Sequence, residues 1–456
     1  MLIVLGGGPA GLAVGWYARR AGIPCVVFEA GPRVGGNCVT FEVDGFRFDS
    51  GAHRFHDKDP QVTADVRALM GEELQLIEVP SYIWSEGALV HFPLSPLNLM
   101  RRMGVLRFAQ AAAQVIAGRV ARRTEPGNFE EFALAIYGRI VAERFLLNYS
   151  SKLWGLPCDR LSPDVAGRRL SGLGLKTFLI EAWGGVRVQD RHLDGRFLYP
   201  RDGYGRIVER LAEECGEGVV QPNSRVTGIG HEGDRITWVE IAGRGRVDVD
   251  EVVSTLPLDS FLRFMTPAVE PSVLAMVGGM NYRNVVLAAF FLKRSAINGA
   301  GTVYFPSDEF PFTRIYEPRN RSRAMSPPGY TSLVAEVPCD SSDGAWTDSD
   351  RAVLDLVQPH LERIGWIRPG DIVGTAVRRL SHAYPVLEKG YAGRVKEVHG
   401  WLSRFKNLRF SGRSGKFRYS WLHEMLRFGR DIVSEAATDR AGGRVAGTTS
   451  EKLFTA

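Results

Sequence analysis

The chain has 456 residues, of which 45% are hydrophobic and 24% charged, the composition of a soluble globular protein with room for two or three domains. A formal net charge of +6 suits an anionic substrate but is too small to indicate nucleic-acid binding. The five cysteines lack paired spacing, which argues against a disulfide framework and for a reducing cytoplasm. The sequence contains no run of about 18 apolar residues, so we expect no transmembrane helix.

The first residues predict a nucleotide-binding turn. The apolar run Met1–Leu5 has the length of one buried strand, and its glycine-broken sequence is unlike a signal peptide. It is followed by the spacing G-x-G-x-x-G. Gly6 allows a tight turn, Gly8 lets a pyrophosphate approach the backbone, and Gly11 lets a helix over residues 9–21 pack closely on the strand. The amino terminus of that helix favours a phosphate.

The next strand narrows the choice of dinucleotide. Residues 24–28 form a second short apolar run that ends at Glu29, where a carboxylate suits a ribose diol. Gly35, Gly36 and Asn37 follow. A second glycine pair after the acidic strand end is a feature of flavoproteins that bury FAD, so the pattern favours FAD over NAD. The alternative is a glycine-rich turn that binds nothing.

Two histidines stand three residues apart in the segment 49–56, which follows a predicted hairpin. His53 and His56 could serve as metal ligands, but no third ligand is nearby in the sequence. We therefore expect no metal, and a loop packed against the flavin ring.

Residues 61–195 read as a helical cap or substrate domain. Helices are predicted over 61–70, 97–123 and 129–147, with strands between residues 76 and 89. The segment 101–123 is basic at both ends and apolar in the middle, so it could lie on a membrane surface. A cap helix with solvated arginines is the preferred reading.

Further along the cap, Tyr149 and Trp154 stand beside a glycine and could form a stacking wall for a ligand, although buried anchors are the equal alternative. Arg168 and Arg169 follow on a predicted helix. Paired arginines suit a diphosphate, whereas solvated arginines are commoner.

The rest of the chain predicts a return to the first domain. Residues 196–267 read as a second part of it and 268–399 as a sheet that binds substrate. Residues 400–437 contain a strand, a glycine loop with Gly412 and Arg413, and a helix that completes the dinucleotide site. The tail, 438–456, is predicted to be flexible.

Several motifs in this order resemble the flavin-dependent superfamily that includes UDP-galactopyranose mutase, protoporphyrinogen oxidase and the amine oxidases, and they resemble the mutases most in the middle of the chain. The matching segments are Gly35-Gly36-Asn37, Gly51-Ala52-His53-Arg54-Phe55-His56, Tyr149 with Trp154, Phe312-Thr313-Arg314-Ile315, Tyr384-Pro385 and Gly412-Arg413-Ser414-Gly415-Lys416-Phe417-Arg418-Tyr419. Ala52 replaces the proline of the mutases. The resemblance implies an α/β fold: a discontinuous Rossmann-type FAD-binding domain (1–60, 196–267 and 400–437), a helical cap (61–195) and a mixed or antiparallel substrate-binding sheet (268–399).

The resemblance also implies roles for single residues. Arg168 and Arg314 would hold a diphosphate, and Tyr384 and Tyr419 would orient it. Tyr149 and Trp154 would grip the base of a nucleotide sugar. His56, near the flavin, would poise its reduced state.

Three functions stay open. A mutase would act at N5 of reduced flavin and rearrange a sugar ring through a flavin–sugar adduct, with no stoichiometric reductant. An oxidoreductase would instead take a hydride from a C–N or C–C bond, and a binding protein would do neither. We expect a small, nucleotide-linked substrate, an external reductant such as NAD(P)H and no nucleic-acid partner, whereas the sequence leaves the oligomeric state open.

Overall fold

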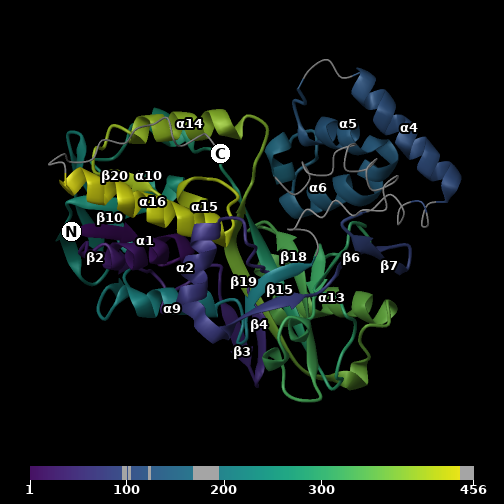
Figure 1. Ribbon diagram of the computed structural model, residues 1–456. Helices are drawn as coiled ribbons and strands as arrows, with labels where there is room; N and C mark the ends of the chain where they lie inside the picture. Colours follow the sequence, from purple (N-terminus) through teal and green to yellow (C-terminus); the bar gives the residue numbers. More distant parts are fainter. Residues whose placement is uncertain (95–99, 101–103, 122–124, 168–194, 442–456) are drawn as a thin grey trace.

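The computed structural model describes residues 1–94, 100, 104–121, 125–167 and 195–441 (Figure 1). Arg168 and Arg169 lie outside these residues, as does most of the predicted tail.

The first domain is built on a five-stranded parallel sheet in the order β20-β13-β1-β2-β9. Its strands are β1 (Leu2–Leu5), β2 (Cys25–Phe28), β9 (Val220–Gln221), β13 (Glu251–Ser254) and β20 (Leu408–Phe410). All four residues of β1 are fully buried, as expected for the centre of a parallel sheet with both faces covered. The strands come from three distant parts of the sequence, so the predicted discontinuous Rossmann-type sheet is confirmed.

Three helices pack closely together at this sheet. They are α1 (Pro9–Arg20), α9 (Arg206–Cys215) and α16 (Leu422–Ala441). Figure 1 shows α1 and α16 side by side, although they are at opposite ends of the chain. Gly429 permits this approach, because a Cβ there would lie 2.7 Å from that of Ala13.

Residues 226–266 add a four-stranded sheet in the order β12-β11-β10-β14. Its strands are β10 (Val226–Glu232), β11 (Arg235–Ile241), β12 (Gly245–Asp248) and β14 (Met265–Thr266). β10 and β11 form a hairpin that turns at residues 233–234, and these strands make a sheet of their own beside the parallel one. Short helices α10 (Leu258–Arg263) and α11 (Pro271–Met276) follow.

The substrate sheet has seven strands in the order β19-β15-β18-β17-β16-β6-β7. They are β15 (Tyr282–Leu292), β16 (Thr302–Tyr304), β17 (Arg314–Tyr316), β18 (Thr331–Cys339), β19 (Ile372–Pro385), β6 (Ser81–Ser85) and β7 (Ala88–Phe92). Residues 81–92, which we expected within the helical cap, thus belong to this sheet. The physical reason is that β6 pairs in parallel with β16, with Ser81 opposite Thr302.

Two small sheets and several helices complete the connections. β3 (Thr40–Val43) pairs with β4 (Phe46–Asp49), and β5 (Leu74–Glu78) pairs with β8 (Arg196–Pro200). The helices α12 (Gly344–Thr347), α13 (Asp350–Arg363), α14 (Tyr391–Leu402) and α15 (Gly412–Gly415) lie in the second half of the chain.

The cap is helical, as its sequence predicts. It contains α4 (Val105–Ala121), α5 (Phe129–Ala142) and α6 (Asn148–Trp154). α2 (Pro60–Met70), which we expected within the cap, instead packs against α9 and α16 of the first domain, because its apolar face joins the buried cluster of that domain. The single helix expected over 129–147 is interrupted, because Gly138 has a φ of +69° and residues 143–147 form a wider π-helical turn. Figure 1 shows α4, α5 and α6 grouped beyond the seven-stranded sheet, next to β6 and β7.

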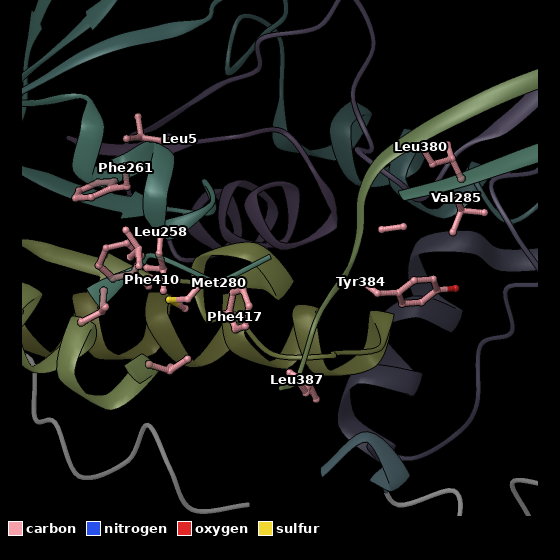
Figure 2. Close-up of a cluster of buried hydrophobic side chains, with 14 of the residues drawn as sticks. Leu5, Leu258, Phe261, Met280, Val285, Leu380, Tyr384, Leu387, Phe410 and Phe417 are labelled. Carbon is pink, nitrogen blue, oxygen red and sulfur yellow. The ribbon is translucent and has the colours of Figure 1, made fainter. Parts of the chain in front are cut away.

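One buried cluster joins the two large sheets. It includes Leu5 and Phe410 from the parallel sheet, and Val285 and Leu380 from the seven-stranded sheet. Figure 2 shows these side chains in a run from one sheet to the other, with Tyr384 near its far end. The sheets therefore share apolar packing, which fixes the position of residues at their junction.

The chain end differs from the prediction of a flexible tail from residue 438. Residues 438–441 continue α16, and two of them are tied down by ion pairs. Asp439 lies 2.8 Å from Arg409, and Arg440 lies 3.1 Å from Glu251. Residues 442–456 lie outside the described part of the chain.

Candidate active site

The turn between β1 and α1 has the geometry that a dinucleotide needs. Gly6 has a φ of +103°, and a Cβ at Gly11 would lie 1.9 Å from the carbonyl oxygen of Gly6. A Cβ at Gly8 would meet nothing within 4 Å. Gly8 also begins α1 without a side-chain cap, so the first amides of the helix are available to an anion. Two glycines thus serve packing, and the third leaves open space where a phosphate would approach.

Glu29 and the second glycine pair close on this turn. The Glu29 carboxylate accepts hydrogen bonds of 2.8 Å from the amides of Gly7 and Gly31. The Gly35 amide donates to the Gly7 carbonyl at 2.8 Å. A Cβ at Gly36 would lie 3.4 Å from Cα of Gly8. The chain therefore folds back over the first turn, which fits a cofactor held between the two glycine segments.

The loop after β20 reaches the same place. Gly412 has a φ of +77°, and a Cβ there would lie 2.9 Å from the Cβ of Ala10 at the start of α1. Ser411 is fully buried, and within the described part of the chain its hydroxyl has no hydrogen-bond partner. The same holds for Nε of Arg413. These polar atoms are available to a bound group, so the residues present fit FAD.

Asn37, also predicted to bind the cofactor, reaches toward the other domain. Its side-chain amide donates to the carbonyl of Ser381 on β19 at 2.7 Å. Asn37 therefore ties the glycine loop to the strand that carries Tyr384.

Arg314 and Tyr384 are predicted site residues that lie far apart in the sequence, and the structure brings their side chains into contact. The Nε of Arg314 donates to Glu336 at 2.5 Å, and its Nη2 donates to the Tyr384 hydroxyl at 2.8 Å. The other oxygen of Glu336 accepts from the Ala52 amide at 2.8 Å. Burial disfavours the guanidinium charge, but the Glu336 carboxylate holds the pKa of Arg314 well above its ordinary value. Arg314 is thus a fixed cation.

A bulge in β19 directs Tyr384 to this place. The pairing of β19 with β15 shifts register between Arg283 and Val285. His382 there has a φ of +54°, and its amide donates to the Asn284 side chain at 3.1 Å. Bulges turn a strand and re-aim its side chains, which is how β19 presents the tyrosine.

Aromatic rings gather around this pair. Trp154 meets Tyr384 and Tyr419 edge-on, with ring centroids 6.0 and 6.2 Å apart, and the two tyrosine rings are 5.7 Å apart. Tyr149 meets Tyr304 edge-on at 5.9 Å. Burial raises the pKa of Tyr384 to about 12 and that of Tyr149 further, so both hydroxyls stay protonated at neutral pH. The structure therefore brings together all four predicted aromatic residues.

The two predicted histidines have different surroundings. His53 stacks on Tyr204 at 5.1 Å, and its Nε2 lies 3.2 Å from the Ser50 hydroxyl. Burial and then nearby guanidiniums lower the pKa of His53 to about 3, so its ring is neutral. His56 is also buried, with its ring against Phe197 at 6.1 Å. His53 therefore stays neutral because of its burial and the positive charges around it.

Three guanidiniums act on His53, and they carry more charge than their partners remove. They belong to Arg314, Arg413 and Arg321. Glu336 pairs with the first, and Asp49 lies 3.9 Å from the last. Arg413 donates to two backbone carbonyls, and none of the described carboxylates forms an ion pair with it. The cluster keeps one net positive charge, which suits an anion.

Sequence reasoning missed three members of the site. Glu336, Tyr304 and Tyr204 belong to none of the motifs that we compared. A signal existed for Glu336, because it is the one carboxylate in the apolar strand β18, and a lone charge on a buried strand requires a partner. Arg168, predicted to bind substrate, lies outside the described residues.

Two further expectations concern a metal site and a membrane-spanning helix. The described residues include no group of three or more His, Cys, Asp or Glu that could hold a metal. None of the described helices has both the length and the apolar composition needed to cross a bilayer.

Known proteins with similar sequences include protoporphyrinogen oxidases and a protein named as a mutase. Protoporphyrinogen oxidase 1 of Spinacia oleracea is 23% identical over 397 residues, which cover 79% of this chain and 70% of that protein. A Klebsiella pneumoniae protein named "Probable UDP-galactopyranose mutase" is 21% identical over 431 residues, which cover 92% of this chain and 90% of that one.

Among solved structures, a reduced UDP-galactopyranose mutase superposes with a TM-score of 0.82 at 21% identity, over 99% of this chain and 97% of that one. This likeness confirms the predicted fold class. The sequence profile described as "Flavin containing amine oxidoreductase" matches residues 9–392. The chain therefore belongs to the flavin-containing amine oxidoreductase family, and it is a flavin-dependent enzyme whose cofactor is FAD.

Proposed function

We propose that the protein rearranges the sugar ring of a nucleotide sugar, or of a similar anionic substrate, as a UDP-galactopyranose mutase-like enzyme. The observation that carries this proposal is the net positive cluster around Arg314 and Arg413 beside a ring of buried aromatic side chains. A diphosphate needs cations, and a base needs aromatic faces.

FAD supplies a reduced N5 atom that can act on the anomeric carbon of such a substrate. The protein's own residues would hold the substrate in place. Arg314, oriented by Glu336, would neutralise the diphosphate before and after the sugar bond breaks. The hydroxyls of Tyr384 and Tyr419 would orient the phosphates, and Tyr149 and Trp154 would contact the base. Arg168, predicted to assist, joins this proposal on sequence grounds alone.

The neutral state of His53 supports this arrangement. A neutral ring adds no positive charge of its own beside the guanidiniums, and its Nε2 lies 3.2 Å from the Ser50 hydroxyl. The motif resemblance implies that His56 poises the flavin, and we propose both histidines as candidates for that role.

The test uses purified holoenzyme, reduced with dithionite and offered a panel of UDP-sugars. We expect an isomeric product without stoichiometric consumption of a reductant, and we expect Arg314→Ala to abolish it. Full turnover by Arg314→Ala on every sugar tried would remove this function. NAD(P)H, offered in place of dithionite, tests the expected external reductant.

An oxidoreductase is the second candidate. The buried aromatic rings around Trp154 would also suit an apolar substrate, and the family's name and the relative from Spinacia oleracea support hydride removal from a C–N or C–C bond. Such an enzyme would consume oxygen or another acceptor with each turnover. Hydrogen peroxide formed from amines, with no binding of UDP, would favour this reading.

A further inference from the structure

The short helix α6 carries two of the site's aromatic residues. Trp154 lies at its last position and meets Tyr384 and Tyr419, whereas Tyr149 lies near its start and meets Tyr304. The helix belongs to the cap, while Tyr304 and Tyr384 belong to the seven-stranded sheet. Any movement of α6 therefore changes the distance between these rings and the cations on the sheet.

Lys152, on the same helix, binds backbone carbonyls of the loop that connects two strands of the sheet. Its ammonium donates to the carbonyls of Phe305, Ser307 and Phe310 at 2.8, 2.7 and 3.1 Å. A lysine has three donors, so these carbonyls use all of them. Burial lowers the pKa of Lys152 to about 8, so burying the ammonium is costly, and the carbonyls offset that cost.

The three carbonyls that Lys152 binds lie in the loop just before Arg314. Residues 305–313 connect β16, which ends with Tyr304, to β17, which begins with Arg314. The loop that Lys152 holds is therefore bounded by two residues of the site. One lysine fixes the spacing between the base-contacting helix and the diphosphate-contacting arginine.

A second cation contacts the same, carboxyl-terminal end of α6. Arg283 on β15 donates from Nε to the Leu153 carbonyl and from Nη2 to the Lys152 carbonyl, both at 3.4 Å. Its Nη1 lies 2.6 Å from Asp340. A cation at the carboxyl end of a helix interacts favourably with its dipole. Arg283 is also the register partner of Tyr384, so this tie leads to the other half of the site.

Gly155 makes the second contact possible. It ends α6 with a φ of +72°, and a Cβ there would lie 2.7 Å from the guanidinium carbon of Arg283. The two ties thus connect the carboxyl-terminal part of α6 to the loop after β16 and to β15, and each tie depends on one side chain, Lys152 or Arg283.

We propose that Lys152 is a positioning residue: it locks α6 to the loop before Arg314 and so sets the affinity for a nucleoside diphosphate. The proposal rests on the proposed function. Lys152 does not touch the substrate but fixes the helix that carries Tyr149 and Trp154. Its loss should therefore weaken the binding of substrate and of transition state by the same factor. That pattern raises KM and leaves kcat nearly unchanged.

The experiment compares Lys152→Met and Lys152→Arg with wild type, as FAD-loaded protein. Methionine keeps the length and removes all three donors, whereas arginine keeps the charge and the donors. Lys396→Met is the matched control, because Lys396 is an exposed residue on α14. The measurements are the Kd of UDP for the reduced enzyme, KM and kcat for the sugar substrate, and the flavin absorption spectrum.

We expect Lys152→Met to raise Kd and KM about tenfold, with kcat changed less than about twofold and the flavin spectrum unaltered. Lys152→Arg should recover most of the affinity, and Lys396→Met should match wild type. Unchanged affinity in Lys152→Met, or a fall in kcat at constant KM, would overturn the proposal.

Hydrogen exchange separates this proposal from the proposed function. Without any ligand, the amides of residues 148–155 should exchange faster in Lys152→Met than in wild type or Lys396→Met. Equal exchange would refute the lock itself. Faster exchange in Lys152→Met, combined with no binding of UDP by the wild-type protein, would refute the proposed function and the nucleotide part of this inference but leave the lock standing.

Discussion

The pair formed by Arg314 and Glu336 allows a quantitative test of the site. The change is Glu336→Gln, which removes the carboxylate charge and keeps the shape of the side chain. The side chain of Glu336 is 3% exposed and that of Arg314 is 14% exposed, with 2.5 Å between the charged atoms. Solvent therefore screens this pair little, and the small value of surface ion pairs does not apply.

The expected magnitude follows from that burial. Removing one partner of a buried pair costs about 3–5 kcal/mol, because the other charge is left uncompensated. The glutamine oxygen can still accept from the Ala52 amide, so we expect a loss of unfolding free energy near the lower end, about 3 kcal/mol. Replacing both residues, as Arg314→Met with Glu336→Leu, should restore stability to within about 1 kcal/mol of wild type.

The assay is equilibrium unfolding in denaturant of the FAD-loaded protein, followed by circular dichroism and flavin release. With the single variants Arg314→Met and Glu336→Leu, the double variant completes a double-mutant cycle that gives the coupling energy between the two residues. Glu232→Gln on an exposed position of β10 is the control, and it should change stability by less than about 0.5 kcal/mol. A loss below about 1 kcal/mol in Glu336→Gln, or a double variant as unstable as the single one, would refute the buried-charge reasoning.

Three further predictions concern other parts of the site. Gly8→Ala should fold normally but lose FAD content by absorbance, since its Cβ has open space that the pyrophosphate needs, whereas Gly11→Ala should fail to fold because its Cβ would lie 1.9 Å from a backbone oxygen. Stability should fall as the pH drops from 6.5 toward 3, because unfolding lets His53 take up a proton that its lowered pKa excludes from the folded state; His53→Gln should flatten that slope in acid titrations, and an unchanged slope would contradict the assignment. Tyr384→Phe removes the acceptor of a bond from Arg314 and should weaken UDP binding about tenfold without altering the flavin spectrum, and equal affinity would show that the hydroxyl has no role.

The parts of the fold that the sequence predicted well are local ones. The strand, turn and helix at residues 1–20 are specified by a few adjacent residues, since the glycine spacing and the apolar run leave little choice of structure. The same is true of the loop at Gly412, which follows its own short strand. Their assembly was predictable only because each motif was similar to one in a known family.

Local sequence patterns could not predict which distant strands pair with one another. The strands predicted between residues 76 and 89 include β6, but its partner β16 lies more than two hundred residues later, and nothing within the segment specifies it. The partner of Arg314 was hidden for the same reason. Glu336 is opposite Arg314 only because of the register between β17 and β18.

That register determines the electrostatics of the site. Arg314 pairs with Glu336 across one strand boundary, and Arg283 pairs with Tyr384 across another. Since side chains alternate between the two faces of a sheet, a slip of one residue would place an alanine or a valine opposite Arg314 and leave its charge unpaired. The glycine-rich turn that would hold FAD is built within the Rossmann-type domain, whereas the pairing of Arg314 with Glu336 exists only in this register. We therefore expect differences in substrate among proteins of this fold to arise from the residues paired at these two places, more than from the glycine-rich turn.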